Sequence, residues 1–300
     1  MLESHLGCID KVNQRSGAIQ IASYLELVKP RLLFLSILSS VFGYILALQN
    51  EFQTVNFFLA IFGTTCVGAG SMALNEYMER EPDAQMLRTA TRPIPVGIIQ
   101  PWQALVFGIA IAVIGILSLG ILVSAPSAFL AFCTLISYLL VYTPLKKITS
   151  LATFAGAVPG ALPPLIGWTA AGGELNFQAL VLFLILFFWQ IPHFLSIDWM
   201  YRDDYARAGF KTLSAVDTTG TMVARQMIVN MSALLSVSLL PTIAGLAKGT
   251  YFFGAFLLGI CFGAVIVASI SNLNERARYV LRASVIYLPL LMLLMVMNKG

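Results

Sequence analysis

Charged residues are scarce in this chain of 300 residues. Asp, Glu, Lys and Arg together make up 11% of it, against roughly 25% in an ordinary globular protein. Apolar residues make up 58%, which leaves too few polar side chains to cover a water-soluble surface. This composition excludes a soluble domain, so the bilayer is the expected solvent for most of the chain.

Paired cysteines and several common catalytic motifs are also lacking. The four cysteines are scattered, with neither a C-x-x-C pair nor the spacing of a metal site, which argues against a disulfide scaffold. The sequence contains no Walker loop, no nucleophile elbow and no H-E-x-x-H motif. The chemistry must therefore come from other polar residues.

Long apolar runs dominate the sequence instead. A bilayer core of about 30 Å is crossed by about 20 helical residues, and nine runs of this size occur. We predict an all-α, polytopic membrane protein with nine transmembrane helices. The predicted spans are 31–49, 54–78, 101–123, 126–145, 150–171, 176–200, 223–246, 250–271 and 279–298.

Two long polar breaks, 79–100 and 201–222, follow the second and the sixth predicted spans. Because the breaks lie four spans apart and combine acids with bases in the same way, they predict two four-helix repeats with a ninth helix added. Pro159, Pro163 and Pro164 are expected to bend the fifth span, since proline cannot donate the helical hydrogen bond.

Basic residues predict the orientation in the membrane, because Lys and Arg stay in cytoplasmic loops. With a cytoplasmic N-terminus, all 18 Lys and Arg residues except Lys248 and Lys299 fall on the cytoplasmic side. The net charge of +4 is therefore a topology signal, and we expect no nucleic-acid partner. We interpret 1–28 as a polar cytoplasmic tail and 29–300 as one transmembrane domain.

The first twenty residues lack the apolar segment that a cleavable secretory signal needs. Glu3 and Asp10 lie where a mitochondrial transit peptide avoids acids. A bacterial inner membrane is therefore favoured over an organellar membrane.

The first polar break carries oxygen ligands at helical spacing. Asn75, Glu79 and Asp83 follow one another at intervals of four residues, which brings them toward one face at the membrane interface. Hard cations such as Mg²⁺ bind carboxylates of this kind together with phosphate oxygens and water. Arg88 and Arg92, again four apart, are suited to grip phosphate.

In the alternative interpretation of this break, its charges only mark the end of a span and determine the topology. Asn75 argues against it, because it lies one turn inside the apolar run, where a polar side chain is costly. A topology signal also needs only bases, whereas this break mixes acids with them.

The second break offers further acids. Asp198 and Arg202 are four residues apart and form a salt bridge in one interpretation. Asp203 and Asp204 are better metal candidates, since adjacent carboxylates do not neutralise each other. Which of these acids touches metal stays open.

Lys146 and Lys147 add cations on the same predicted face. Oxygen ligands, a ring of bases and an apolar helical chamber together suit a diphosphate ester of a long hydrocarbon at the cytoplasmic end. Loss of the diphosphate leaves an allylic cation that an electron-rich acceptor captures.

The first break, from Asn75 to Pro93, resembles the first acidic motif of the UbiA superfamily of intramembrane prenyltransferases. Three further segments, 142–147, 190–194 and 202–205, resemble the haem-farnesylating branch of that superfamily. Many relatives carry a second D-x-x-x-D, whereas here Arg202 stands four residues after Asp198.

The resemblance implies that farnesyl diphosphate alkylates a vinyl group of haem B. Water supplies a hydroxyl, which gives haem O for terminal oxidases, with haem A synthase or oxidase assembly proteins as further partners. It implies Mg²⁺ or Mn²⁺, with Asn75, Glu79 and Asp83 at one ion and Asp204 at the other. It places six bases around the diphosphate: Arg88, Arg92, Lys146, Lys147, Arg202 and Lys211. His193 is expected to contact haem, with simple packing as the alternative.

Two other functions compete with this one. A sister prenyltransferase with a quinone precursor or another aromatic acceptor would use the same metal and diphosphate chemistry. A transporter would also have repeats and broken helices, but it predicts polar residues near the middle of the bilayer.

Overall fold

The computed structural model describes residues 21–49 and 51–300, and helices form almost all of its regular structure. Within these two ranges, eight segments are long and apolar enough to cross a membrane. Seven of them are the single helices α2 (Pro30–Ala47), α3 (Thr54–Met78), α5 (Pro101–Leu122), α10 (Phe177–Met200), α13 (Thr221–Ile243), α14 (Gly249–Ile270) and α15 (Leu273–Met297). The eighth, Ala125–Leu145, joins α6 (Ala125–Ile136), a π-helical turn (Ser137–Tyr142) and α7 (Thr143–Leu145).

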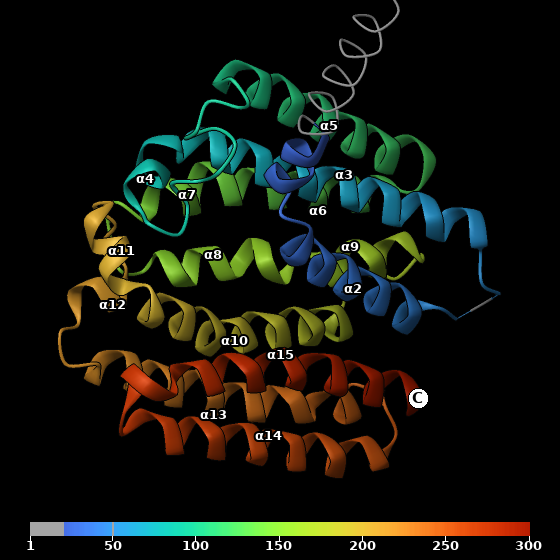
Figure 1. The fold of residues 1–300 in the computed structure, drawn as a ribbon. Helices are drawn as coiled ribbons and strands as arrows, with labels where there is room; N and C mark the ends of the chain where they lie inside the picture. Colours follow the sequence, from blue (N-terminus) through green and yellow to red (C-terminus); the bar gives the residue numbers. More distant parts are fainter. Residues whose placement is uncertain (1–20, 50) are drawn as a thin grey trace, which may run out of the picture.

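The predicted fifth span, 150–171, differs from the expectation of one continuous transmembrane helix. It forms α8 (Ala152–Ala161) and α9 (Pro163–Ala170), which follow each other across the bundle in Figure 1. Pro163 and Pro164 have no amide hydrogen for the preceding turn, so the helix restarts after Leu162. Among the described residues the structure therefore has eight spans and one interrupted segment, where the sequence predicts nine spans with a bend in the fifth; Pro159 lies inside α8, which continues through it.

Helix α10 lies at the centre of the packing and contacts α8, α13 and α15. The last three helices, α13 to α15, pack on one another, whereas α3 packs on α5 and α2 on α9 (Figure 1). The core is a large apolar cluster that includes Ile185, Leu186 and Leu195 of α10. The division into two four-helix repeats stays a prediction.

Glycines permit the close approach of α2 and α9. A Cβ atom on Gly43 would overlap the carbonyl of Pro164, and one on Gly167 would overlap the carbonyl of Ser40. Since neither neighbour is a flexible side chain, only glycine fits at these two positions. Small residues of this kind allow membrane helices to pack backbone to backbone.

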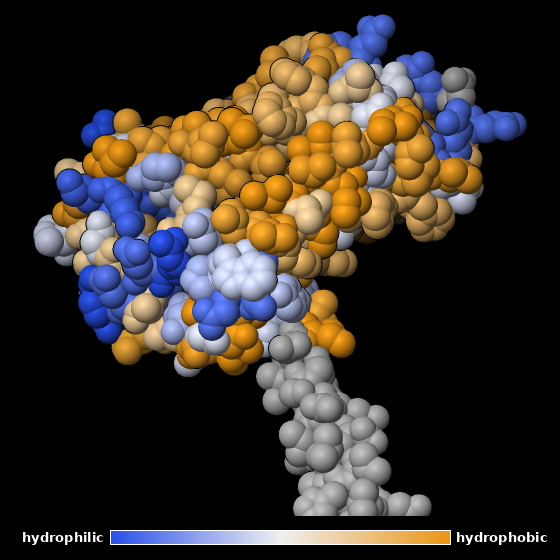
Figure 2. Space-filling view, turned by 90° about the horizontal axis from the view of Figure 1, so that it is seen from above, coloured by the Kyte–Doolittle hydropathy of each residue, from blue (hydrophilic) through white to orange (hydrophobic). Residues whose placement is uncertain are grey.

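Polar segments gather at one end of the bundle. The short helices α4 (Arg80–Gln85), α11 (Arg202–Arg207) and α12 (Leu213–Val216) lie there together with α7 (Figure 1). Figure 2 shows a hydrophobic band between hydrophilic surfaces at the two ends of the molecule. The chain is thus a multi-pass integral membrane protein whose two polar breaks share one end.

The predicted tail 1–28 lies mostly outside the described residues. Within the described part, Leu27 is fully buried in a cluster with Ile94 and Ile99, and the ring of Tyr24 lies 4.9 Å from that of Phe107. The segment just before α2 therefore packs against the polar end of α5.

We expect Gly167→Ala to lower the free energy of unfolding by about 1–3 kcal/mol, because the added methyl group overpacks the contact between α2 and α9. Gly263→Ala on α14 is the matched control, since its Cβ meets only Met231 at an ordinary 3.8 Å. Unfolding in mixed micelles measures both variants. Equal stability of the two would contradict the proposed role of the glycine contact.

Cysteines placed at the exposed positions Gln85 and Ala206 should react with an impermeant thiol reagent only from the cytoplasmic side. A cysteine at Glu174, at the other end, should react only from the opposite side. The experiment uses a background without the four native cysteines. Labelling of Gln85 and Ala206 from opposite sides would exclude a site shared by the two polar breaks.

Candidate active site

The last turn of α3 and the short helix α4 bring four polar residues together. Asn75 and Glu76 belong to the last turn of α3, Glu79 caps its C-terminus, and the amide of Asp83 donates to the carbonyl of Glu79 at 2.8 Å. All four are buried, with at most 6% of each residue exposed. Backbone hydrogen bonds at four-residue spacing, from Glu79 to Asn75 and from Asp83 to Glu79, bring the three predicted residues to the same end of α3, and their role in metal binding stays a prediction.

Each carboxylate of this group faces a base from another segment. Lys146 Nζ lies 2.8 Å from Glu79 Oε1, and Arg92 Nη1 lies 2.6 Å from Asp83 Oδ2. Glu76 Oε1 lies 3.6 Å from Arg92 Nε. The acidic motif is therefore held in a network of buried charge pairs.

Lys29 completes this network from the N-terminus of α2. Its Nζ donates to Asn75 Oδ1 at 3.2 Å and lies 3.5 Å from Glu76 Oε1. Burial is the main reason that the pKa of Lys29 falls to about 8; the charge of nearby Arg92 acts in the same direction, and the neighbouring carboxylates oppose both. Burial also disfavours the charge of Arg92, but Asp83 and Glu76 outweigh burial and raise the pKa of Arg92.

Lys29 and Glu76 are the functional candidates that the sequence reasoning missed. Glu76 stands beside Asn75 inside the same apolar run, so the cost of a polar residue there was a usable signal. Lys29 had no comparable signal, since a base before the first span also fits the topology rule.

Asp198 faces the site from α10. It is buried, its Oδ2 accepts from the amide of Ser214 at 3.0 Å, and its Oδ1 has no hydrogen-bond partner. A cavity of about 70 Å³ is lined by Asp198 together with Lys146, Tyr142 and Tyr205. This cavity connects the second acidic segment with the base that holds Glu79.

The neighbouring acids are placed differently. The side chain of Asp203 is 89% exposed and lies 3.9 Å from Arg202, and Asp204 pairs with Arg207 at 2.8 Å. Arg202 stacks on the ring of Trp199 at 4.5 Å, and no salt bridge joins it to Asp198 within the described chain. Of the three acids left open by the sequence, the structure brings Asp198 to the cavity.

The two polar breaks contact each other above the charge network. Met86 packs in a small cluster with Ala208 and Phe210. Arg88 Nη2 donates to the hydroxyl of Tyr205 at 3.4 Å, although Arg88 itself is exposed. Segments 79–100 and 201–222 therefore form one polar region.

Two predicted bases lie at the edge of this region. The side chains of Lys147 and Lys211 are exposed, and the amide of Lys211 donates to the carbonyl of Lys146 at 2.7 Å. They do not pair with the buried acids in the described structure.

His193 lies deeper in α10, on the turn before Asp198. It is 8% exposed, stacks on Trp189 with 5.1 Å between ring centroids, and its Nδ1 is 2.8 Å from Ser284 Oγ. An ionisable side chain at this depth is costly unless it has a function or a partner.

The donor set fits a hard divalent cation. Glu76 Oε2, Asp83 Oδ1 and Asp198 Oδ1 are buried oxygens with no partner, and leaving such atoms unpaired is costly. Within the part of the chain that the structure describes, no three His, Cys, Asp or Glu side chains stand close enough to hold a metal alone. Mg²⁺ does not need such a cage, because it commonly takes one or two carboxylates plus phosphate oxygens and water.

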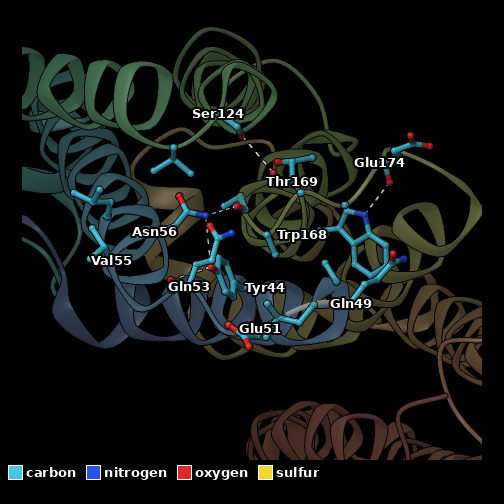
Figure 3. Close-up of a pocket in the computed structure, with 18 of the residues that line it drawn as sticks. Tyr44, Gln49, Glu51, Gln53, Val55, Asn56, Ser124, Trp168, Thr169 and Glu174 are labelled. Atoms are coloured by element: carbon cyan, nitrogen blue, oxygen red, sulfur yellow. Dashed lines mark hydrogen bonds between the residues drawn. The ribbon is translucent and has the colours of Figure 1, made fainter.

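A larger cavity of about 1010 Å³ opens at the opposite end of the bundle. Figure 3 shows Tyr44, Asn56, Trp168 and Thr169 around it, with Glu174 at its edge. It contains none of the predicted site residues. Cavity size alone therefore does not identify the site here, and the buried charge network does.

Comparison with known proteins identifies a family and several similar relatives. Residues 36–293 match the UbiA prenyltransferase family. A protoheme IX farnesyltransferase from Solibacter usitatus is 43% identical, over 92% of this chain and 98% of the relative. One from Koribacter versatilis is 39% identical, over 93% of this chain and 94% of the relative.

Solved structures show the same fold at low identity. A digeranylgeranylglyceryl phosphate synthase has a TM-score of 0.77 and 18% identity, over 93% of this chain and 98% of that protein. A UbiA homolog from Archaeoglobus fulgidus bound to GPP and Mg²⁺ has a TM-score of 0.73 and 14% identity, over 91% and 98%. From the match over most of its length, this chain belongs to the UbiA prenyltransferase family.

Proposed function

We propose that this chain transfers the farnesyl group of farnesyl diphosphate to a vinyl group of protohaem IX, haem B. It is a prenyltransferase by family, and its full-length relatives are named for this acceptor. A hydroxyl from water completes the product, haem O, which terminal oxidases use.

The observation that carries the chemistry is the buried charge network at the polar end. Lys29, Arg92 and Lys146 each pair with a buried oxygen ligand, while other carboxylate oxygens there have no partner. A diphosphate with its metal suits this arrangement. The bases can exchange their carboxylate partners for phosphate oxygens, and the carboxylates can then bind the cation. Exposed Arg88, Lys147 and Lys211 and half-buried Arg202 would add charge at the rim.

Asn75, Glu79 and Asp83 would hold one Mg²⁺ or Mn²⁺, and Asp198 with Asp204 would hold a second. We propose Asp198 in place of Asp203, because Asp203 points to solvent whereas Asp198 lines the cavity. A divalent cation supplies positive charge that neutralises the diphosphate as it departs.

The protein itself orients the two substrates and limits water. When the bond between farnesyl C1 and the diphosphate oxygen breaks, a vinyl carbon attacks C1. Water adds to the neighbouring carbon and loses a proton. Little acid or base catalysis is needed at the vinyl group, so alignment and electrostatic stabilisation of the diphosphate account for the rate.

His193 would contact the haem, as a ligand of the iron or a partner of a propionate. The N-terminus would lie in the cytoplasm of a bacterial cell with the site at the inner face of the membrane. Haem A synthase or oxidase assembly proteins would be the recipients of the product.

Incubation of the purified protein with haem B, farnesyl diphosphate and Mg²⁺, followed by mass analysis of the pigments, tests the function. The expected product has the mass of haem B plus one farnesyl group and one hydroxyl group. Prenylation of a quinone precursor with no change in haem would favour the sister activity instead.

Removal of divalent cations with EDTA should abolish turnover, and added Mg²⁺ should restore it, because buried carboxylates would otherwise repel the diphosphate. Full activity in chelator would exclude the metal assignment.

Asp83→Asn should lower the rate by about two orders of magnitude, through the loss of a contact that stabilises the leaving group.

Asp198→Asn should lower turnover by about tenfold or more, whereas Asp203→Asn should stay within about twofold of wild type. The two substitutions remove the same charge, but only Asp198 is buried beside Lys146. Steady-state rates at saturating Mg²⁺ compare them. The reverse order of effects would move the second metal position to Asp203.

A further inference from the structure

We propose that Ser284, on the last helix, is a positioning residue that holds His193 in the form able to bind haem iron. This inference rests on the proposed function, since it concerns the acceptor side of the same site. It goes beyond the acidic motif and the bases, none of which lie on α15.

The hydrogen bonds of the Ser284 hydroxyl determine which nitrogen of the His193 ring carries the hydrogen. Ser284 Oγ donates its one proton to the carbonyl of Leu281 at 2.7 Å. It lies at the same time 2.8 Å from His193 Nδ1. With the hydroxyl proton on the Leu281 carbonyl, Ser284 Oγ can only accept from His193, so the tautomer that satisfies both contacts has its hydrogen on Nδ1.

The other ring nitrogen is therefore left with a lone pair. His193 Nε2 has no hydrogen-bond partner among the residues that the structure describes. It is not among the buried side-chain atoms that lack a partner, so it stays accessible to a ligand. A neutral imidazole with Nδ1–H donating to an acceptor is the arrangement by which proteins orient a histidine for a metal. Haem iron, in the acceptor proposed above, is the metal that this histidine would bind.

The ring is also fixed in direction. Trp189, one turn before His193 on α10, stacks on the imidazole and donates its Nε1 hydrogen to the carbonyl of Ser284 at 2.8 Å. Ser284 is fully buried where α15 packs against α10 (Figure 1). The backbone and the hydroxyl of one residue thus hold both rings.

A haem titration of the full-length protein tests the proposal. Ser284→Ala should weaken haem binding by about tenfold and shift the absorption spectrum of ferric haem away from that of an imidazole complex. Affinity for farnesyl diphosphate should change by less than about twofold. In a His193→Ala background, the same substitution should have no further effect on haem, because no imidazole remains to be held.

Ser238→Ala is the matched control, since Ser238 is an equally buried hydroxyl that bonds Tyr287 and not a histidine. It should keep wild-type haem affinity and spectrum. If Ser284→Ala does not fold, Ser284→Cys replaces it, because a thiol has similar volume but accepts hydrogen bonds weakly.

Two results would overturn the positioning role: an unchanged haem spectrum and affinity in Ser284→Ala, or an equal loss of affinity with and without His193. Failure of the proposed function is a separate result. It would appear as no farnesylated haem from the wild-type protein, whatever Ser284 does.

Discussion

Buried charge pairing at the membrane interface is the constraint on which the polar end depends. Glu76, Glu79 and Asp83 are almost sealed from solvent, where an unpaired carboxylate is far more costly than in water. Removing one partner of such a pair typically costs about 3–5 kcal/mol, because the other charge stays buried. The positions of Lys29, Arg92 and Lys146 therefore follow from the acids that they neutralise.

This pairing requires the helix ends to meet. Lys29 comes from the start of α2 and Lys146 from just after α7, and both reach acids at the end of α3. The approach of α2 to the rest of the bundle depends in turn on Gly43 and Gly167. Packing in the apolar band and charge pairing at the interface are thus parts of one arrangement.

Much of this could be predicted from the sequence, because the bilayer imposes strong rules. Apolar runs of fixed length and the distribution of basic residues indicate spans and a shared polar end. The interruption at Leu162 was less visible, since the sequence predicts a bend at Pro163 and Pro164 but not whether the helix restarts. Four-residue spacing was enough to predict that Asn75, Glu79 and Asp83 lie at the same helix end.

Contacts between distant segments could not be predicted in this way. Lys29 and Asn75 are 46 residues apart, and His193 and Ser284 are 91 residues apart. No local pattern marks one serine among many as the partner of a histidine. Asp198 and Asp203 are equally acidic in sequence, and only burial separates them.

The balance of charge also determines how a diphosphate can enter. Three carboxylates, Glu76, Glu79 and Asp83, face three bases, Lys29, Arg92 and Lys146, so the buried network is close to neutral. A diphosphate adds several negative charges to this low-dielectric region, and the bases cannot serve both it and the acids. Divalent cations that arrive with the substrate would resolve this conflict, because the carboxylates could turn to the metal while the bases turn to phosphate. In the proposed reaction, the residues that stabilise the protein before substrate binds would also stabilise the leaving group.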